Sequence, residues 1–530
     1  MLAPAPLFVA AVVLLASYLY RKLSYKRLKQ YANFPQHPPG LVLGHLGTVD
    51  EYVRRQPPKA HIDMALAAMR DALGRPSVMF MDLRPLSSCT VAVGSYEVAE
   101  QIISSQLPYS PGKVPEVWKL LEHLAGPRSI LSAKGEEWKA LRKRFNPGFA
   151  PQHLLTLLPS ILDKVSQFLE HLDTYARTGE EFSLQSRATD LTFDIIGHVA
   201  LDFNMDAQTN NPTEFMRQYR ALIETYLTEH LDLPWWCTPL TQWKRRNLSK
   251  WVRHSLRRMI HERHSEGLSS RSILSMSLQG IDTLTPDVVD VTCDQISSFL
   301  FAGHDTTSTL MSWALYELSR TPHALSAVRA ELDSLFGPDS SPDAVRDCLL
   351  APGGEGLLNR MPYTSAVIKE TLRLWPPGAT SRMSMPGEGL TIRTPEGADL
   401  CLDGMLVYLV HSIIQRDPAV FGDTADRFVP ERWLQGADEK IPTGAFRAFE
   451  RGPRNCIGQE LANIEARVLL AVAVRRYDFV KVGTGAPVLD DAKRPILNEH
   501  GQYQVTSEMY QTRQVTSKPI DGMMMKVRFA

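Results

Sequence analysis

Residues 449–458 of this chain read Phe-Glu-Arg-Gly-Pro-Arg-Asn-Cys-Ile-Gly, and this stretch decides how the rest of the sequence is interpreted. Gly452 and Pro453 predict a tight turn, because glycine reaches positive φ and proline fixes φ. Gly458 leaves room for a flat molecule close to the backbone, and Arg454 adds a permanent cation. Cys456 therefore stands in a rigid loop with hydrogen-bond donors near its sulfur. A lone cysteine is more often an inert buried residue, but this setting suits a thiolate that ligates iron.

The loop resembles the haem-binding signature of the cytochrome P450 family, F-x-x-G-x-R-x-C-x-G. Glu450 departs from stricter forms of the signature, which prefer a small residue after the phenylalanine, but this departure does not touch the ligand. The resemblance implies a haem b whose iron is bound by Cys456. The other loop residues that it places at the haem are Phe449, Gly452, Arg454 and Gly458.

Composition and charge limit the possible functions. The 530 residues are enough for a large core, and the 44% apolar fraction is typical of a globular protein. Lys+Arg and Asp+Glu both number 58, which argues against a general nucleic-acid binder. The six cysteines are scattered without a C-x-x-C pair, so a reducing compartment is favoured over a disulfide framework or a zinc site.

The N-terminus predicts a membrane anchor. Residues 7–20 are almost wholly apolar, and a basic cluster follows at once between Arg21 and Lys29. A cleaved signal peptide would have a basic start, which this segment lacks. The positive charges place the bulk of the chain on the cytosolic side, and the resemblance implies a single-pass protein of the endoplasmic reticulum membrane. We therefore expect an anchor over residues 1–22, a basic and Pro-rich hinge over 23–45, and the catalytic domain over 46–530.

The domain itself is predicted to be mainly α-helical. Thr285 is a good N-cap and Pro286 suits a first helical turn, so a helix is expected over 286–320, apolar on more than one side and buried. Other expected elements are a helix over 362–374, a hairpin with strands near 391–393 and 399–402, a strand over 405–410 and a helix over 460–474. The fold class is thus a single large helical domain of cytochrome P450 type with a small β-rich region, plus the N-terminal transmembrane helix.

Polar residues interrupt the middle of the long helix. Ala302-Gly303-His304-Asp305-Thr306-Thr307-Ser308 is poor in helix formers, and Gly alone costs about 1 kcal/mol relative to Ala. One interpretation is a Thr/Ser patch that bonds back to its own helix. The other follows from a resemblance to the family segment A-G-x-[DE]-T-[TS]. It implies that Ala302 and Gly303 lie against the haem and a small ligand, and that Asp305 and Thr306 deliver protons.

Three charged residues resemble a structural triad of the family. Glu370 and Arg373 share one helix face at i, i+3, a spacing that by itself usually marks a solvated surface pair. They match the family's E-x-x-R, whose pair is buried behind the haem, and Arg432 supplies the expected third member. The implied role of the triad is structural, because one glutamate shared by two arginines makes a rigid, paired network.

Further basic residues are candidates for the two haem propionates. Trp138 and Arg142 fit the family's W-x-x-x-R and share a helix face. Arg382 and Arg454 are additional candidates, since two buried negative charges need several cations. The neighbouring Lys139, Lys143 and Arg144 form either a docking face for an acidic reductase or an ordinary solvated helix face.

These motifs occur in family order from Trp138 to Gly458, so the resemblance covers nearly the whole chain after the anchor. It implies a monooxygenase that takes O2 and NADPH-derived electrons, through an NADPH-cytochrome reductase with cytochrome b5 as a further candidate donor. One oxygen atom would enter a hydrophobic small molecule, in a step of fungal secondary metabolism on a polyketide- or terpenoid-like compound.

Alternative functions remain at this point. The first is a fatty-acid or alkane hydroxylase, the second a haem-thiolate isomerase or dehydratase, and the third a haem sensor. The last two are disfavoured because the acid-Thr pair is present. Expected substrate contacts are residues 107–131, 211–236, Phe299 and Leu300, Ala379 and Thr380, and the segment near Met509, although core packing explains them equally well. The sequence names neither the substrate nor the position that is oxidised.

Overall fold

The computed structural model describes residues 4–103, 121–226, 237–267, 270–437, 440–512, 514 and 516–530. The chain divides into two compact units, each assembled from segments that are distant in sequence. The first unit comprises Met1–Val114, Ala379–Asp417 and Arg451–Pro453. The second comprises Pro115–Gly378, Pro418–Glu450 and Arg454–Ala530.

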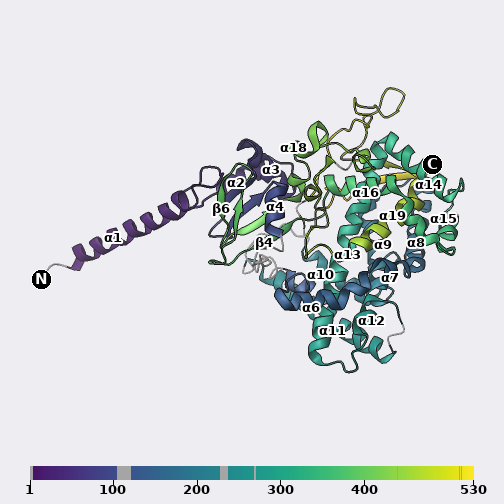
Figure 1. Cartoon of the computed structure of the whole chain (residues 1–530), viewed down its shortest axis with the longest axis horizontal. Coiled ribbons are helices and arrows are strands. Elements are labelled where there is room, and N and C mark those ends of the chain that lie inside the picture. The colour runs from purple at the N-terminus through teal and green to yellow at the C-terminus, as the bar shows by residue number, and fades with distance from the viewer. Residues whose placement is uncertain are drawn as a thin grey trace. The chain divides into compact units, whose positions relative to one another are not determined.

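The second unit is mainly helical (Figure 1). Its helices are α6 (Gly135–Phe145), η2 (Asn146–Phe149), α7 (Pro151–Leu155), α8 (Leu158–Thr178), α9 (Leu184–Leu201), α10 (Glu214–Glu224), α11 (Pro239–Ser265), α12 (Ile273–Leu278), α13 (Pro286–Arg320), α14 (Pro322–Phe336), α15 (Pro342–Leu350), η4 (Gly354–Arg360), α16 (Pro362–Leu374), α18 (Pro418–Phe421), η5 (Gly422–Thr424), η6 (Pro430–Trp433), η8 (Thr443–Ala445) and α19 (Gln459–Arg476). A small antiparallel sheet has the strand order β3-β9-β8, formed by Phe182–Ser183, Met524–Phe529 and Tyr477–Lys481.

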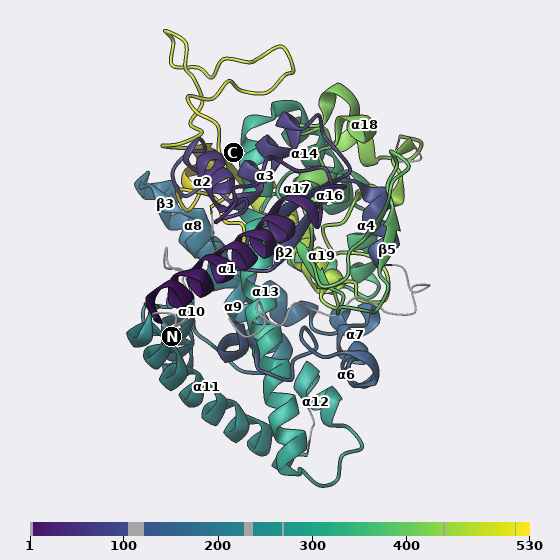
Figure 2. The ribbon, with the colours of Figure 1, turned by 90° about the vertical axis from the view of Figure 1, so that its left-hand side faces the viewer.

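Helix α13 is the central helix of this unit and confirms the predicted range 286–320. The Thr285 side chain accepts a hydrogen bond from the backbone N–H of Val288, and Pro286 occupies the first turn. The helix is 35 residues long and most of its side chains are buried. Helices α9, α11, α16 and α19 pack against it, and α9 runs beside it in both ribbon views (Figures 1 and 2). A helix covered on several sides must be apolar on several sides, as its sequence is.

The first unit is built on a four-stranded sheet of order β1-β2-β7-β4, with a separate hairpin β5-β6. The strands are β1 (Val78–Asp82), β2 (Cys89–Val93), β4 (Thr380–Met383), β5 (Thr391–Arg393), β6 (Asp399–Cys401) and β7 (Leu406–Leu409). Strand β2 pairs in parallel with β7, Thr90 opposite Leu406 and Val93 opposite Leu409. Its helices are α1 (Pro4–Ser24), η1 (Tyr25–Lys29), α2 (Leu46–Arg54), α3 (Ile62–Ala72), α4 (Tyr96–Ile103) and α17 (His411–Ile414).

The remaining predicted elements agree with the structure. Helices α16 and α19 and strand β7 lie within a few residues of their predicted ranges, and β5 pairs antiparallel with β6 as the expected hairpin. The fold is therefore the expected helical domain with a small β region.

All six cysteines are free.

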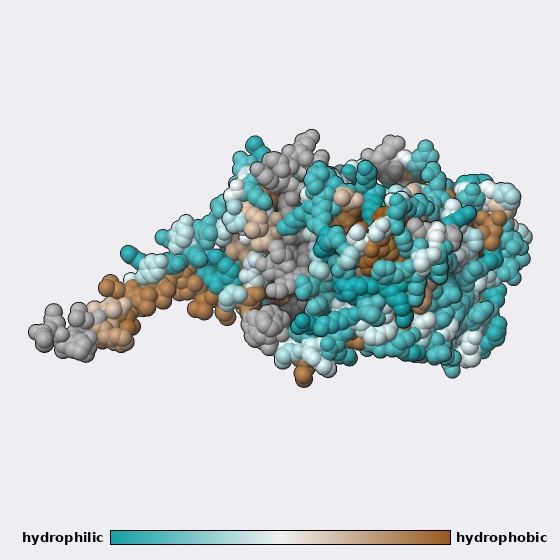
Figure 3. Space-filling view, turned by 90° about the horizontal axis from the view of Figure 1, so that it is seen from below, coloured by the Kyte–Doolittle hydropathy of each residue, from teal (hydrophilic) through white to brown (hydrophobic). Residues whose placement is uncertain are grey.

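The N-terminal helix is long and apolar. Among the described residues one stretch, Phe8–Lys29, is long and apolar enough to cross a membrane. Its hydrophobic side chains, such as Leu14 (71% exposed), face outward, as the brown surface along α1 shows (Figure 3). This finding agrees with an anchor by length and composition.

The stretch expected to act as a hinge is attached to the first unit by a buried ion pair. The π-helical turn η1 continues α1 without a break, and its Arg27 is buried. Arg27 Nη1 lies 2.6 Å from Asp82 Oδ1, and Arg27 Nη2 donates to the carbonyls of Val42 and Arg84, each at 2.9 Å. The segment around Arg27 is thus packed against β1 rather than extended away from it.

Candidate functional site

The Cys456 loop is closed by its own backbone. Cys456 N–H donates to the Phe449 carbonyl at 2.8 Å, and Gly452 has a φ of 72°, in the region that favours glycine. A Cβ added to Gly458 would lie 3.9 Å from Cys456 Sγ. The two glycines therefore have separate uses: Gly452 makes the turn, and Gly458 keeps the backbone beside the sulfur free of a side chain.

Cys456 is an exposed residue in the structure of the chain, although many protein atoms surround its sulfur. Burial among protein atoms raises the pKa of this thiol, and the backbone N–H groups of Gly458 and Gln459 and the charge of Arg142 act in the opposite direction. Backbone N–H donors and a nearby guanidinium are the groups that stabilise a thiolate and tune a metal bound to it.

Two arginines and a tryptophan gather beside this loop. Arg142 Nη1 and Nη2 donate to the backbone carbonyl and side-chain oxygen of Asn455, both at 3.1 Å. The Arg454 guanidinium lies 4.7 Å from the ring centroid of Trp138, and its Nη2 donates to the Ala133 carbonyl at 2.7 Å. Helix α6 thus brings Trp138 and Arg142, predicted from W-x-x-x-R, to the residues that flank Cys456.

Glu370, Arg373 and Arg432 form one buried cluster. Glu370 Oε2 and Oε1 accept from Arg373 Nε and Nη2, each at 2.8 Å, and both side chains are fully buried. Arg432 Nε donates to Glu370 Oε1 at 3.1 Å. Trp433 Nε1 also donates to Glu370, at 2.8 Å, so the carboxylate is held by two arginines and an indole. Such a network is rigid because its charges are paired and its hydrogen bonds are made.

The middle of α13 is exposed on one side. Ala302 is exposed and Thr306 is half-buried, whereas most of the helix is buried. These two residues are one turn apart and share a face, and Thr306 Oγ1 donates to the Ala302 carbonyl at 2.8 Å. An exposed strip within a central helix is a place where a ligand can lie against the backbone.

Gly303 also has a packing role, while its predicted place against the haem and a small ligand stays a prediction. A Cβ at this position would come within 2.8 Å of Ile196 Cδ1 and Cγ1 in α9. The Thr192 hydroxyl, one turn before Ile196, donates to the His304 carbonyl at 2.8 Å. The absence of a side chain at Gly303 is therefore accounted for by close packing of α9 on α13, and Ala302 is the residue with an open face.

Asp305 is held by the C-terminal segment. Its Oδ1 lies 2.5 Å from Lys518 Nζ, and its Oδ2 accepts a hydrogen bond from the Thr516 hydroxyl. Burial acts to raise the pKa of Asp305, but the charge of Lys518 and the other groups around the carboxylate outweigh it and lower that pKa. Asp305 is thus a charged, paired carboxylate rather than one that faces an open space.

His304 lies next to Asp305 but does not carry the charge that an ion pair with it would need. Its ring stacks on Phe193 with centroids 3.8 Å apart, its Nδ1 donates to the Leu300 carbonyl at 2.7 Å, and its Nε2 lies 3.6 Å from Asp305 Oδ1. Burial lowers the pKa of His304 to about 4. The imidazole is therefore neutral near pH 7.

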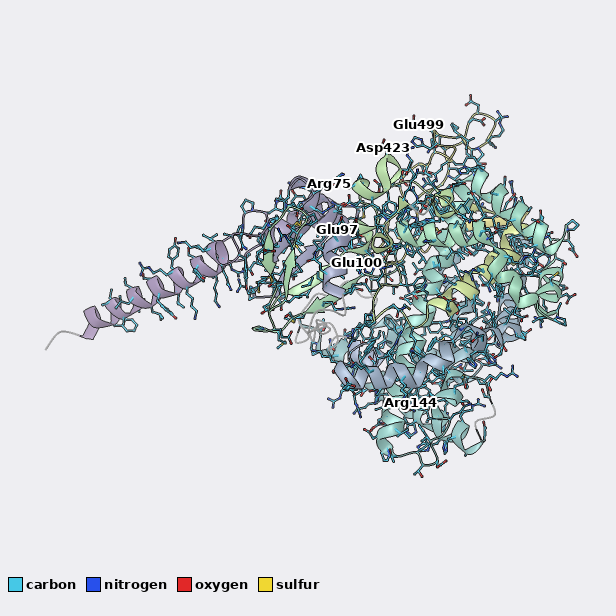
Figure 4. The ribbon with its side chains drawn as sticks, viewed as in Figure 1. Arg75, Glu97, Glu100, Arg144, Asp423 and Glu499 are labelled. Atoms are coloured by element: carbon cyan, nitrogen blue, oxygen red, sulfur yellow. The ribbon has the colours of Figure 1, made fainter. Side chains whose placement is uncertain are left out.

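Several predicted residues have other neighbours. Arg382 lies in the first unit on β4, buried, and donates to the Ser381 carbonyl at 3.0 Å. Arg144 (Figure 4), expected on a reductase-docking face, instead donates to the Ser277 carbonyl at 3.0 Å and to Thr292 Oγ1 at 2.6 Å. Lys139 and Lys143 are exposed, as that face requires.

The expected substrate contacts have mixed outcomes. Phe299 is buried in contact with Phe145 and Phe149, at centroid distances of 5.3 and 5.0 Å, so core packing explains it. Met509 is buried and lies close to Gly485. Residues 107–120 and 227–236 of the expected stretches lie outside the described residues.

Sequence reasoning missed the partners of several predicted residues. Lys518 and Thr516 are more than 200 positions from Asp305, and no local pattern marks them. Asn455, which binds Arg142, stands inside the Cys loop itself. Trp433 directly follows Arg432, and its adjacency to the predicted triad was the one signal that could have identified it.

The residues present fit a haem. Cys456 is an exposed thiol in a rigid loop, and Arg142 and Arg454 are cations suited to carboxylates on the same side of that loop. Helix α19 begins three residues after Cys456 and packs against α13, whose Ala302 is exposed. A thiolate for iron, cations for propionates and an open helix face are therefore combined in the second unit.

Comparisons with known proteins give the same assignment. The family model for Cytochrome P450 matches residues 57–506. The chain is 31% identical over 463 residues to cytochrome P450 monooxygenase acrF of Aspergillus aculeatus, covering 81% of this chain and 90% of acrF. It is 29% identical over 497 residues to cytochrome P450 monooxygenase polC of Polytolypa hystricis, covering 87% and 84% of the two chains.

The fold is matched independently of sequence. A crystal structure of a cytochrome P450, CYP102L1, aligns with a TM-score of 0.74 at 20% identity, over 94% of this chain and 99% of that one. The family model spans most of the chain, and acrF is more than 30% identical over four-fifths of it. The chain therefore belongs to the cytochrome P450 family and is a P450 monooxygenase.

Proposed function

We propose that this chain is a membrane-anchored haem-thiolate monooxygenase that inserts one atom of O2 into a hydrophobic small molecule, in a step of fungal secondary metabolism. The observation that carries the proposal is the Cys456 loop: an exposed thiol, fixed by the Cys456 N–H bond to Phe449 and flanked by Arg142 and Arg454. The acrF and polC relatives, both monooxygenases of fungi, support the reaction class and the setting.

In this proposal the second unit holds a haem b. Cys456 would bind its iron, with Phe449, Gly452 and Gly458 shaping the loop beneath it. Arg142 and Arg454 would neutralise its propionates, Trp138 could donate its indole N–H to one of them, and Ala302 would contact the haem. Glu370, Arg373 and Arg432 contribute by rigidity, since their cluster fixes the chain before the loop through Trp433. Arg382 lies in the first unit, and its role as a propionate candidate stays a prediction from the sequence.

When bound, the haem supplies dioxygen activation and one-electron chemistry, and the chain controls where protons go. The Thr306 hydroxyl donates to the Ala302 carbonyl, which leaves its oxygen lone pairs open to accept from a water on the exposed face. Asp305 is one residue away and therefore points about 100° around the helix, toward Lys518. We propose that Thr306 positions the proton at the open face of α13, and that the Asp305–Lys518 pair, in which Lys518 retains 13% exposure, connects this part of the helix to solvent.

Electrons are proposed to come from NADPH through a separate reductase, with cytochrome b5 as a second donor. The exposed Lys139 and Lys143 on α6 offer positive charge for an acidic partner, although Lys139 is also paired with Glu136 at 2.7 Å. Reductase-supported turnover should slow with rising salt and in a Lys139→Glu/Lys143→Glu variant. Turnover that changes neither with salt concentration nor in this variant would exclude the docking face.

Two alternative reactions are separable from the first. A fatty-acid or alkane hydroxylase would share every residue above and differ only in substrate. A haem-thiolate isomerase or dehydratase would need neither O2 nor reductase, and the paired Asp305 and the open Thr306 favour the monooxygenase over it.

Two experiments test the proposed function: substitution of Cys456, and assays from which NADPH, O2 or reductase is left out. Cys456→Ser in the full chain should abolish the carbon monoxide difference band of a thiolate-ligated haem, because the serine hydroxyl does not replace the thiolate as an electron donor. Retention of that band would overturn the assignment of the ligand. Product formation by the wild type should require NADPH, O2 and reductase together; product formed without them would identify an isomerase or dehydratase.

A further inference from the structure

The turn before Cys456 contains a buried ion pair that none of the roles above uses. Glu450 stands where the haem-binding signature prefers a small residue. Its side chain is 7% exposed and is paired with Arg447, which is fully buried. A buried charged pair must be complete, because removing one partner leaves an uncompensated charge away from water. The large residue in the signature position is therefore paired with a fully buried arginine three positions earlier.

The pair closes a turn that shares a residue with the thiolate loop. Glu450 N–H donates to the Arg447 carbonyl at 2.8 Å, and Arg447 Nη1 donates to the Gly444 carbonyl at 3.2 Å. Glu450 has a φ of 55°, a conformation that a residue with a side chain adopts only where its surroundings impose it. Phe449 lies inside this turn, and its carbonyl accepts the N–H of Cys456. A contact that fixes the turn at 447–450 therefore also fixes the Phe449 carbonyl, which accepts the hydrogen bond from Cys456 N–H.

The same pair lies at the end of a chain of contacts from the Glu370 cluster. Trp433 Nε1 donates to Glu370, and the Trp433 ring contacts that of Phe446 edge-on at a centroid distance of 5.4 Å. Phe446 is the residue immediately before Arg447. The contacts thus run from the buried carboxylate through two aromatic rings to the ion pair, and from there through Phe449 to Cys456.

We propose that Arg447 and Glu450 are positioning residues for the thiolate ligand: their ion pair fixes the Phe449 carbonyl and thereby the orientation of Cys456 toward iron. This inference rests on the proposed haem-thiolate function. It predicts that the pair controls the ligation state of the haem, which a merely stabilising ion pair would leave unchanged. Neither residue touches the reacting atoms.

The test is a double-mutant cycle in the full, haem-loaded chain. Arg447→Met, Glu450→Ser and the double variant are compared for two quantities: the ratio of thiolate- to thiol-ligated haem in the carbon monoxide difference spectrum, and the midpoint of thermal unfolding. Each single variant should lower the ratio about tenfold or more, because it strands a buried charge in the turn. The double variant should recover most of the midpoint, since neither charge remains, but its ratio should stay several-fold below the wild type because the turn is no longer closed.

Arg475→Met is the matched control. Arg475 is also buried and ion-paired, to Asp333 at 2.8 Å, but it lies near the far end of α19. The Arg475→Met substitution should lower the midpoint of thermal unfolding and leave the ratio of thiolate- to thiol-ligated haem unchanged. The proposal is overturned if the ratio in the double variant returns to the wild-type value together with the midpoint, or if Arg475→Met lowers the ratio as much. If a single variant does not fold, the double variant and Arg447→Lys, which keeps the charge but loses the planar fork, decide the question in the same way.

Failure of this inference is distinct from failure of the proposed function. A wild type without a thiolate band, or a Cys456→Ser variant that retains one, contradicts the haem-thiolate assignment. A wild type with that band and a ratio that is insensitive to both Arg447 and Glu450 contradicts only the positioning role.

Discussion

Thr306 and Asp305 are neighbours in sequence that face different parts of the second unit. Thr306 shares the exposed face of α13 with Ala302, while Asp305 is buried against Lys518 and Thr516. Because consecutive residues of a helix do not face each other, the two cannot pass a proton directly as a side-by-side pair. Thr306 therefore lies on the open face of α13, and Asp305 lies in a buried pair with Lys518.

Thr306→Ala should therefore lower coupling without removing the haem. With no hydroxyl on the open face, proton delivery there would be slower, and more of the O2 consumed would be released as hydrogen peroxide. The product formed per NADPH consumed should fall about tenfold, which is less than the ~10²–10⁴-fold typical of a lost general acid because water can partly replace the hydroxyl. Parallel assays of NADPH, product and peroxide measure it.

Thr309→Ala is the control for this prediction. The Thr309 hydroxyl is buried and donates to the Asp305 carbonyl at 2.8 Å, away from the open face. Its loss should change stability but leave coupling near the wild-type value. Equal peroxide release from both variants would show that the open face is not the route of proton delivery.

His304 makes stability depend on pH in a defined window. The folded chain protonates this buried imidazole only near its pKa of about 4, whereas the unfolded chain does so near 6.5. Between these values the unfolded state binds more protons, so the free energy of unfolding falls as the pH drops. Between pH 7 and pH 5 the loss due to this residue should be about 2 kcal/mol.

His304→Gln should remove this contribution while keeping an amide that can donate to the Leu300 carbonyl. Denaturant unfolding at pH 7 and pH 5 measures the difference between variant and wild type. His254→Gln, at an exposed position of α11, should retain the wild-type dependence. An unchanged pH dependence in His304→Gln would show that the imidazole is not neutral in the folded chain.

At the scale of elements, the contact between α9 and α13 is set by two small features of the sequence. Gly303 lets Ile196 approach the α13 backbone, and Thr192 donates to the His304 carbonyl across the interface. At this contact Gly303 is half-buried beside Ile196, and Ala302 is exposed. The open face of the candidate site is therefore a consequence of helix packing.

Gly303→Ala should destabilise the protein by about 1–3 kcal/mol, because the new Cβ would overlap Ile196. Ile196→Ala should destabilise it on its own by leaving a cavity, and the double variant should be more stable than the sum of the two effects predicts, by about 1 kcal/mol or more. Thermal or denaturant unfolding measures all three variants.

Gly356→Ala controls for the change of residue type, since a Cβ there meets nothing within 4 Å. It should be near neutral. Additive effects of Gly303→Ala and Ile196→Ala would mean that the two positions do not share one packing contact.

At the scale of the whole molecule, the side chain of Arg27 holds the end of the N-terminal helix against the first unit. The buried pair with Asp82 holds the turn after α1 against β1, and the charge of Asp82 is also met by Arg84 at 2.7 Å. These arginines hold the pKa of Asp82 at about 2 against the opposing effect of burial. The apolar helix thus emerges from a fixed point on the first unit.

Leu14→Lys/Leu15→Lys should release the full chain from membranes. Both leucines are exposed in the middle of the apolar run, and two lysines near a bilayer centre cost about 6 kcal/mol together. Flotation with lipid vesicles measures the bound fraction. Leu350→Lys/Leu489→Lys, which changes two exposed leucines elsewhere, should remain bound; a variant of the apolar helix that still floats would contradict the anchor.

The sequence predicted elements better than it predicted partners. The Thr285 cap, Pro286 and the following Pro322 bounded α13 to the residue, because caps and prolines act locally. Glu370 and Arg373 were recognisable because i, i+3 spacing is itself local. Lys518, by contrast, reaches Asp305 across more than 200 residues, and the sequence did not predict that Ile196 packs against Gly303. Both depend on contacts that only folding creates.

The sequence by itself determined the family, the helical fold class, the Cys456 loop and the apolar N-terminal helix, since each is written in consecutive or closely spaced residues. The tertiary structure decided which way those residues face. It paired Asp305 with Lys518, opened α13 at Ala302 and Thr306, and closed the turn before Cys456 with Arg447 and Glu450. The physical reason is that burial and charge pairing are properties of neighbours in space, and these neighbours come from segments that meet only in the folded chain.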